Sequence, residues 1–184
     1  MNSLKLSKIQ AVSGRVTLPG SKSLTNRALL LAALSEGKTE LLNVLKSDDT
    51  ARMLEALRSL GVKITERGSV CEVVGLGHAF DIGLNTLTLD LGNAGTAMRP
   101  LCAALSFSRG VFRLTGETRM MERPIGPLCE AIKSCGIHID YLNNDGFPPV
   151  QIRGGKAIRR DLEIDGSLSS QFISALLMAS PLCG

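Results

Sequence analysis

Apolar and polar positions follow two different periods along this chain, and each period marks one type of element. Alternation with a period of two, typical of half-buried strands, occupies residues 62–65, 70–74, 87–91, 111–114 and 137–141. Leu- and Ala-rich runs, or apolar residues at helical spacing, predict helices over residues 28–34, 48–60, 99–105 and 125–134. Two further strands are expected over residues 4–18 and 40–44. Strands and helices therefore alternate, which predicts an α/β fold.

Residues that begin or end helices give the expected boundaries of these elements. Pro19 and Gly20 close the first strand, and Ser47, followed by Asp48 and Asp49, is expected to cap the second helix. Glycines stand just past the four helices, at Gly37, Gly61, Gly110 and Gly136. The two aspartates therefore have a structural explanation and need no role in acid–base chemistry.

The predicted elements recur as an internal repeat of about seventy residues, of the form βαβαββ. Residues 32–34 match residues 103–105, and residues 57–64 match residues 132–139. The chain thus contains two copies of one structural unit.

A third copy of the repeat starts but is not completed. Residues 162–165 are its expected leading strand, residues 166–171 its polar turn and residues 175–179 its Ala- and Leu-rich helix. The sequence ends a few residues later, so we expect it to be part of a longer protein.

Composition and charge narrow the kinds of partner. Hydrophobic residues make up 44% of the chain and aromatic residues 3%, with no Trp, so an aliphatic core is expected. The net charge is +4, and the densest basic pair, Arg159 and Arg160, is followed at once by Asp161. Few aromatic stacking platforms and no basic run argue against nucleic acid. A mild positive excess suits a small anion better.

Cysteine and histidine usage argues against a metal site. The five cysteines form no Cys-x-x-Cys pair and are expected to be mostly buried thiols of a reducing, cytoplasmic compartment. They are Cys71, Cys102, Cys129, Cys135 and Cys183. His78 and His138 have no ligand-spaced partner, so packing explains both. Neither a membrane span nor an N-terminal signal is expected.

The stretch over residues 91–100 (LGNAGTAMRP) joins a predicted strand to a predicted helix through a glycine-containing turn. Gly92 and Gly95 allow the backbone to adopt positive φ and to approach a ligand closely. Thr96 is the expected N-cap, which places Pro100 within the first turn, where its missing N–H breaks no helix bond. Such a helix start suits an anion, although an ordinary strand–turn–helix connection has the same pattern.

Each copy of the repeat places a polar turn of this kind before an Ala- and Leu-rich helix. If the copies pack around one axis, three helix N-termini offer backbone donors, hydroxyls and cations to one phosphate or carboxylate surface. The residues concerned are Lys22, Ser23 and Arg27, then Asn93, Gly95 and Thr96, then Ser169, Ser170 and Gln171.

Four blocks of the sequence resemble signatures of the 3-phosphoshikimate 1-carboxyvinyltransferase, or EPSP synthase, family. They are residues 19–34 (PGSKSLTNRALLLAAL), 91–100, 121–126 (MERPIG) and 165–172 (DGSLSSQF), in the family's order and spacing. The resemblance covers essentially the whole chain. It implies an enolpyruvyl transferase-like domain of βαβαββ repeats in an inside-out α/β arrangement, with helices packed inside and sheets outside.

The resemblance also implies an activity of the full-length protein. Such enzymes transfer the enolpyruvyl group of phosphoenolpyruvate to the 5-hydroxyl of shikimate 3-phosphate and release phosphate, in the biosynthesis of chorismate and the aromatic amino acids. They use no metal or organic cofactor, and their inhibitor glyphosate is expected in the phosphoenolpyruvate part of the site. Nucleic acid and membrane are not expected partners, and the full-length protein is expected to be a monomer.

The family motifs imply a role for each site residue. Lys22 is the expected catalytic residue and would contact both substrates. Shikimate 3-phosphate would be held by Lys22, Ser23, Arg27, Ser169, Ser170 and Gln171, and phosphoenolpyruvate by Lys22, Asn93, Gly95, Arg123 and Gln171. Arg123 opposes the helix dipole at its place before Pro124, which favours a functional role. Arg99, in contrast, is expected to hold a neighbouring carboxylate or carbonyl.

The same resemblance divides the chain. Residues 1–18 would be a leading strand that packs with a second domain, and residues 19–184 an incomplete N-terminal substrate-binding domain. Its repeats would cover 19–80, 83–155 and, only begun, 156–184. The family's acid–base carboxylates lie in the second domain, and catalysis needs them within hydrogen-bond reach. We therefore expect this chain alone to bind shikimate 3-phosphate weakly and to be inactive, and its bare apolar surface could let it self-associate.

Two alternative functions are open at this point. UDP-N-acetylglucosamine enolpyruvyl transferase, of cell-wall synthesis, has the same fold, but the SKSLTNR and SSQF blocks are typical of a site for a small phosphorylated ring. A non-catalytic anion-binding module would use the same turns without the chemistry.

Overall fold

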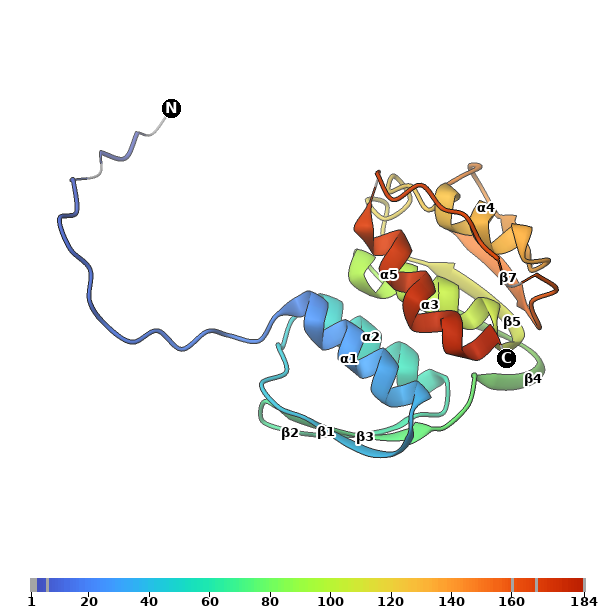
Figure 1. The fold of residues 1–184 in the computed structure, drawn as a ribbon, viewed down its shortest axis with the longest axis horizontal. Coiled ribbons are helices and arrows are strands. Elements are labelled where there is room, and N and C mark those ends of the chain that lie inside the picture. Colours follow the sequence, from blue (N-terminus) through green and yellow to red (C-terminus); the bar gives the residue numbers. More distant parts are fainter. Residues whose placement is uncertain (1–2, 6, 160, 168, 184) are drawn as a thin grey trace.

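The repeated sequence pattern corresponds to two layered units, each with a sheet on the outside and helices on the inside (Figure 1). The computed structural model describes residues 3–5, 7–159, 161–167 and 169–183. The first unit contains α1 (Lys22–Leu34), β1 (Glu36–Leu41), α2 (Asp48–Ser59), β2 (Lys63–Arg67) and β3 (Val70–Leu76). Its sheet has the strand order β1-β3-β2, and both strand pairs are antiparallel.

The second unit is a complete βαβαββ repeat. It contains β4 (Asp81–Asp90), α3 (Gly95–Ser106), β5 (Arg109–Thr115), α4 (Gly126–Ser134), β6 (His138–Tyr141) and β7 (Val150–Gly154). Its sheet has the order β4-β5-β7-β6; β4 runs parallel to β5, and the other two pairs are antiparallel. The third copy is represented by α5 (Ser170–Ala179) and a short 3₁₀ helix, η1 (Ser180–Cys183).

Helix α3 is the centre of the molecule. It packs against α1, α2, α4 and α5 and lies against β5 and β7 (Figure 1). All its residues from Ala97 to Ser106 are buried. A helix whose own side chains are small or aliphatic on nearly every face can be covered on all sides by other elements. The α/β fold with helices inside and sheets outside is therefore confirmed.

The ends of α2 and α4 follow the predicted signals. Ser47 and Thr50 form a capping box, in which the Thr50 N–H donates to Ser47 Oγ (3.4 Å) and the Ser47 N–H donates to Thr50 Oγ1 (2.9 Å). Gly61 and Gly136 follow the last turns of α2 and α4 with φ of 89° and 87°. Glycine adopts this conformation without strain, so both helices end where the sequence predicts.

Several features differ from the sequence predictions. Gly37 and Gly110 lie inside β1 and β5 and do not end the preceding helices, since the C-caps of α1 and α3 are Ser35 and Phe107. Strand β7 is absent from the predicted elements, because only Val150 and Ile152 alternate there. Residues 162–165 form no strand, since none of the described strands lies beside them to share backbone hydrogen bonds.

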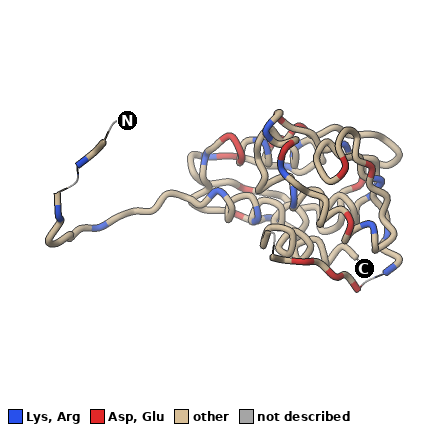
Figure 2. The backbone as a smooth tube through the Cα atoms, turned by 90° about the horizontal axis from the view of Figure 1, so that it is seen from above, with Lys and Arg blue, Asp and Glu red and all other residues tan. Residues whose placement is uncertain are grey.

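The leading strand expected at the start of the chain is not formed in this structure. Residues 7–20 have no regular secondary structure and extend away from the folded part (Figures 1 and 2). Their apolar side chains are exposed, namely those of Ile9, Val12, Val16 and Leu18. A strand requires a neighbour for its backbone groups, and none of the described strands pairs with this segment.

Charge and cysteine predictions can be compared with the structure over most of the chain. Lys and Arg are interspersed with Asp and Glu over the folded part (Figure 2). Buried thiols are confirmed for Cys71, Cys102, Cys129 and Cys135, whereas Cys183 is half-buried. Predictions that involve Met1, Asn2, Leu6, Arg160, Leu168 and Gly184 lie outside the described residues. Within the described ranges, no helix combines the length and apolar character needed to cross a bilayer.

Candidate anion-binding site

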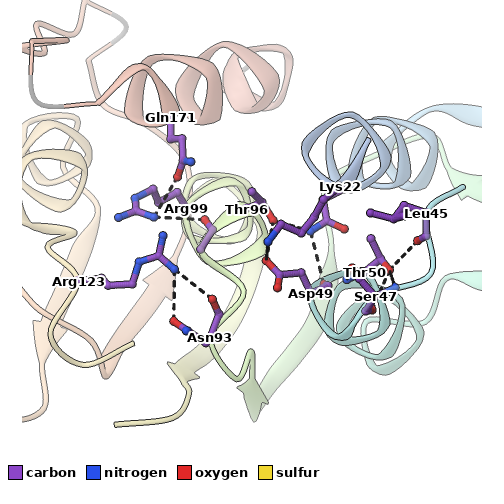
Figure 3. Close-up of polar contacts among 12 residues, drawn as sticks. Lys22, Leu45, Ser47, Asp49, Thr50, Asn93, Thr96, Arg99, Arg123 and Gln171 are labelled. Carbon is purple, nitrogen blue, oxygen red and sulfur yellow. Dashed lines mark hydrogen bonds and ion pairs between the residues drawn. The ribbon is translucent and has the colours of Figure 1, made fainter. Parts of the chain in front are cut away.

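The N-terminal ends of α1, α3 and α5 lie close together, as the repeat predicts (Figure 3). Side-chain contacts join them: Asn26 of α1 donates to Thr96 of α3 (2.8 Å), and Arg99 of α3 donates to Gln171 of α5 (3.0 Å). A helix N-terminus carries partial positive charge and N–H groups without helical partners. Three such ends in one region favour an anion there.

Lys22 is the first residue of α1 and forms an ion pair with Asp49 of α2 (Figure 3). Its Nζ lies 3.2 Å from Asp49 Oδ2, and Thr96 Oγ1 donates to the same oxygen at 3.3 Å. Asn26 in turn donates to Thr96, so this hydroxyl both accepts and donates. These contacts fix the Lys22 ammonium beside the first turn of α3, while 46% of its side chain stays exposed to solvent.

Asp49 has a role that the sequence pattern did not indicate. The Ser47 hydroxyl caps α2, and the Asp49 carboxylate turns toward Lys22 instead. The interpretation of Asp49 as a capping residue alone is therefore incomplete. Its second role is hidden in the sequence because a Ser-Asp-Asp run is in itself a common helix start.

The first turn of α3 differs from the prediction. The helix begins at Gly95, its N-cap is Ala94, and no side chain caps it. Thr96 therefore lies inside the helix, and Pro100 lies beyond the first turn. The prediction of Thr96 as N-cap is wrong, because its hydroxyl bonds to Asn26 and Asp49. No side-chain acceptor caps this helix end, and the backbone N–H groups of Gly95 and Ala97 donate to the backbone oxygens of Asn93 (3.0 Å) and Ala94 (2.9 Å).

Arg123 lies against the turn that precedes α3. Its Nη1 donates to the backbone oxygen of Asn93 (3.1 Å) and to Asn93 Oδ1 (3.3 Å). Gly95 makes room for this guanidinium, since a Cβ at Gly95 would lie 2.6 Å from its central carbon. The structure therefore brings together Arg123, Asn93 and Gly95, three of the residues expected at phosphoenolpyruvate.

Arg99 is buried between α3, the segment before α4, and α5. Its Nη1 donates to Gln171 Oε1 (3.0 Å) and to Gly95 O (3.4 Å), and its Nη2 donates to Pro124 O (3.2 Å). Burial lowers the pKa of Arg99 from its ordinary value, and the charge of Arg123 lowers it further. The prediction that Arg99 holds a neighbouring carbonyl is confirmed.

A side-chain contact joins α5 to α1 near their N-terminal ends. Ser169 is the N-cap of α5, and its Oγ accepts from the Gln171 N–H (3.2 Å). Arg27, one turn after Ser23 on α1, donates to Ser174 Oγ of α5 at 3.4 Å. Ser23 is half-buried and Ser170 is exposed. The residues expected at shikimate 3-phosphate therefore lie on the first two turns of α1 and at the start of α5, and the Arg27–Ser174 contact joins these two helices.

The side chains that make these contacts carry more positive than negative charge. Four basic side chains take part, from Lys22, Arg27, Arg99 and Arg123, against one carboxylate, from Asp49. The excess of fixed donors fits a phosphate or carboxylate. Over the residues that the structure describes, no three His, Cys, Asp or Glu side chains gather as metal ligands would.

Comparisons with known proteins agree on one family. The family model of EPSP synthase (3-phosphoshikimate 1-carboxyvinyltransferase) matches residues 6–184. Curated relatives named 3-phosphoshikimate 1-carboxyvinyltransferase, from Aliivibrio salmonicida and a Sulfurovum species, are 55% and 54% identical over 99% of this chain and 43% of their own. A solved EPSP synthase from Acinetobacter baumannii aligns with a TM-score of 0.76 and 31% identity, over 90% of this chain and 37% of that chain. The chain thus spans less than half the length of these relatives.

Proposed function

This chain belongs to the EPSP synthase family, and from that premise we propose that it forms the shikimate 3-phosphate site and part of the phosphoenolpyruvate site of a 3-phosphoshikimate 1-carboxyvinyltransferase. One observation carries the proposal: Lys22, Arg123 and the Arg99–Gln171 pair lie around the first turn of α3, which no side chain caps (Figure 3). Two small acids bound side by side require many fixed donors in one region, and this region supplies them.

Shikimate 3-phosphate is assigned to the adjacent turns of α1 and α5. The first turns of these helices carry hydroxyls, an amide and a guanidinium, and the charged groups would balance the phosphate. The residues assigned are Lys22, Ser23, Arg27, Ser169, Ser170 and Gln171.

Phosphoenolpyruvate is assigned to the turn before α3, with Asn93, Gly95, Arg123 and Gln171 as its contacts. Lys22 is linked to the same turn through Asp49 and Thr96, so it would reach both substrates and is the proposed catalytic residue. Negative charge grows on the phosphate as its bond to the enolpyruvyl carbon breaks. The Lys22 and Arg123 cations would stabilise that charge.

Turnover is proposed for the full-length protein. It would transfer the enolpyruvyl group to the 5-hydroxyl of shikimate 3-phosphate, in the cytoplasm, as a monomer and without a cofactor. We assign residues 1–18 to the contact with a second domain and residues 19–184 to the N-terminal substrate domain. The second domain would supply the acid–base groups, so this chain alone is expected to bind weakly and to be inactive.

An NMR titration of this chain tests the proposed site. Shikimate 3-phosphate is expected to shift the amide resonances at the starts of α1, α3 and α5. Lys22→Met is expected to weaken binding about tenfold, as the loss of a charged hydrogen bond would. Lys63→Met, which removes an exposed lysine of β2, is the control and should leave the affinity unchanged. Shifts elsewhere, or a preference for UDP-N-acetylglucosamine, would contradict the assignment, as would an inactive full-length enzyme given both substrates.

A further inference from the structure

Gln171 is held by the oxygen of its side-chain amide. Arg99 Nη1 donates to Gln171 Oε1 at 3.0 Å, and because a guanidinium carries donors and no acceptor, the amide must present its oxygen. The NH₂ group therefore lies away from Arg99. Figure 3 shows it on the side of Thr96 and Lys22, where the proposed ligand would bind.

Arg99 is itself fixed in place by three parts of the chain. Besides Gln171, it donates to Gly95 O of α3 and to Pro124 O before α4. Its guanidinium carbon also lies 5.5 Å from the ring centre of Phe172, and the residue is 7% exposed. A side chain already ordered on three sides can impose one orientation on its neighbour with little further loss of entropy.

The same arrangement recurs on the other side of the α3 start. Arg123 donates to Asn93 Oδ1, so the Asn93 amide also presents its oxygen to a guanidinium and its NH₂ group elsewhere. Asp49 Oδ2 accepts from both Lys22 and Thr96. The side-chain oxygens Gln171 Oε1, Asn93 Oδ1 and Asp49 Oδ2 thus accept from protein donors, whereas the NH₂ groups of Gln171 and Asn93 have no protein acceptor among the described residues.

We infer that Arg99 is a positioning residue, which holds the Gln171 amide with its N–H groups toward the bound anion. The inference rests on the proposed function, because it takes Gln171 as a substrate contact. It adds a rule of specificity: the ligand atom at Gln171 must be an acceptor, such as a phosphate, carboxylate or hydroxyl oxygen. A ligand with only a donor at this place would be rejected.

A double-mutant cycle on this chain tests the inference, with shikimate 3-phosphate titrated and chemical shifts as the readout. Gln171→Ala and Arg99→Met are each expected to weaken binding about tenfold, and the double variant no more than either. Arg153→Met, at an exposed arginine of β7, is the matched control and leaves the affinity unchanged. Losses that multiply in the double variant would overturn the inference.

The side-chain NH₂ resonances of Gln171 give a second readout that needs no ligand. Arg99→Lys keeps the positive charge but loses the forked donors, so these resonances are expected to shift. This variant also decides the matter if Arg99→Met fails to fold. Unchanged Gln171 resonances in Arg99→Lys overturn the inference while the proposed function stands. If the resonances shift but the wild-type chain binds neither substrate, the proposed function fails and the placement of the amide stands.

Discussion

The two repeats of this chain differ by one strand. The sheet of the second repeat has four strands, with β4 parallel to β5, whereas the sheet of the first has three. The corresponding edge of β1 has no strand beside it among the described residues. Aligning the first residues of α1 and α3 places Val16 and Leu18 at the positions of Leu89 and Leu91.

The matched positions have opposite environments. Leu89 and Leu91 are 3% and 0% exposed, whereas Val16 and Leu18 are 81% and 74% exposed. Both segments carry the same alternating apolar pattern and both lead into a helix of the core. The alternating pattern alone therefore does not make a strand, because the backbone groups and the apolar face of the segment must also be paired and covered.

The largest expected effect is a difference in the free energy of unfolding between substitutions at two matched positions. Leu91→Ala removes a fully buried side chain and is expected to lower the free energy of unfolding by about 3 kcal/mol. Leu18→Ala, at the matched exposed position, is expected to lower it by less than about 0.5 kcal/mol. Urea unfolding followed by circular dichroism measures both values. A comparable loss in Leu18→Ala would show that residues 7–20 dock on the folded part in solution.

The next effect concerns the helix starts, where Gly95 of the second repeat occupies the position of Lys22 in the first. A Cβ at Gly95 would meet the Arg123 guanidinium. Gly95→Ala is therefore expected to displace Arg123 and to weaken phosphoenolpyruvate binding about tenfold, with little change for shikimate 3-phosphate. Calorimetric titration with each ligand measures the difference. Gly14→Ala, where a Cβ meets nothing within 4 Å, is the control; equal weakening for both ligands would contradict two separate parts of the site.

A smaller effect is expected at the carboxylate that serves the first repeat. Asp49→Asn removes the charge partner of Lys22 and is expected to weaken binding of both substrates by roughly threefold, because the ammonium is less firmly placed. The free energy of unfolding should change by less than about 1 kcal/mol, since the pair is partly exposed. Asp48→Asn, on the same helix turn, is the control for titration and unfolding. Equal effects of the two substitutions would show that Asp49 acts only at the start of α2 and does not place Lys22.

The smallest effect lies where the second helix of each repeat meets the following strand. Arg58 pairs with Glu66 at 2.7 Å in the first repeat, and Lys133 and Tyr141 both contact Glu130 in the second. The hydrogen bond from Lys133 lowers the pKa of Glu130 from its ordinary value, and Tyr141 adds to this. The resulting stabilisation is present above the unfolded-state pKa of about 4.3. It is lost as the pH falls through the lower folded-state value.

In Glu130→Gln, the free energy of unfolding should therefore fall less between pH 7 and pH 3 than it does in the wild type. The difference should be less than about 1 kcal/mol, because the pair is largely exposed. Urea unfolding between pH 3 and 7 measures this for the wild type and the variant. Parallel pH profiles would show that the Lys133–Glu130 pair adds nothing to the second repeat.

Local signals explain what the sequence could predict. The repeat, the helix ends at Gly61 and Gly136, and the buried core of α3 depend on spacing and on residues a few positions apart. Arg99 could also be interpreted correctly, because an arginine on an otherwise apolar helix needs protein acceptors when it is buried.

Features that depend on distant residues were missed or misplaced. Asp49 and Thr96 each had a sufficient local explanation as helix caps, and their contacts with Lys22 and Asn26 come from another helix. The strand predicted over residues 4–18 fails for the same reason, because its partner is not specified by its own pattern. Which substrate each site residue contacts stays a prediction.

The open edge of β1 also bears on how this chain behaves when concentrated. Glu36, Lys38 and Glu40 of β1 are exposed, and charged side chains on an edge strand oppose pairing with the edge of another molecule. The exposed Ile173 and Leu177 of α5 carry no such protection. Crowded copies are therefore expected to meet through helices and to form small discrete assemblies, while the incomplete sheet is guarded against growth into fibrils.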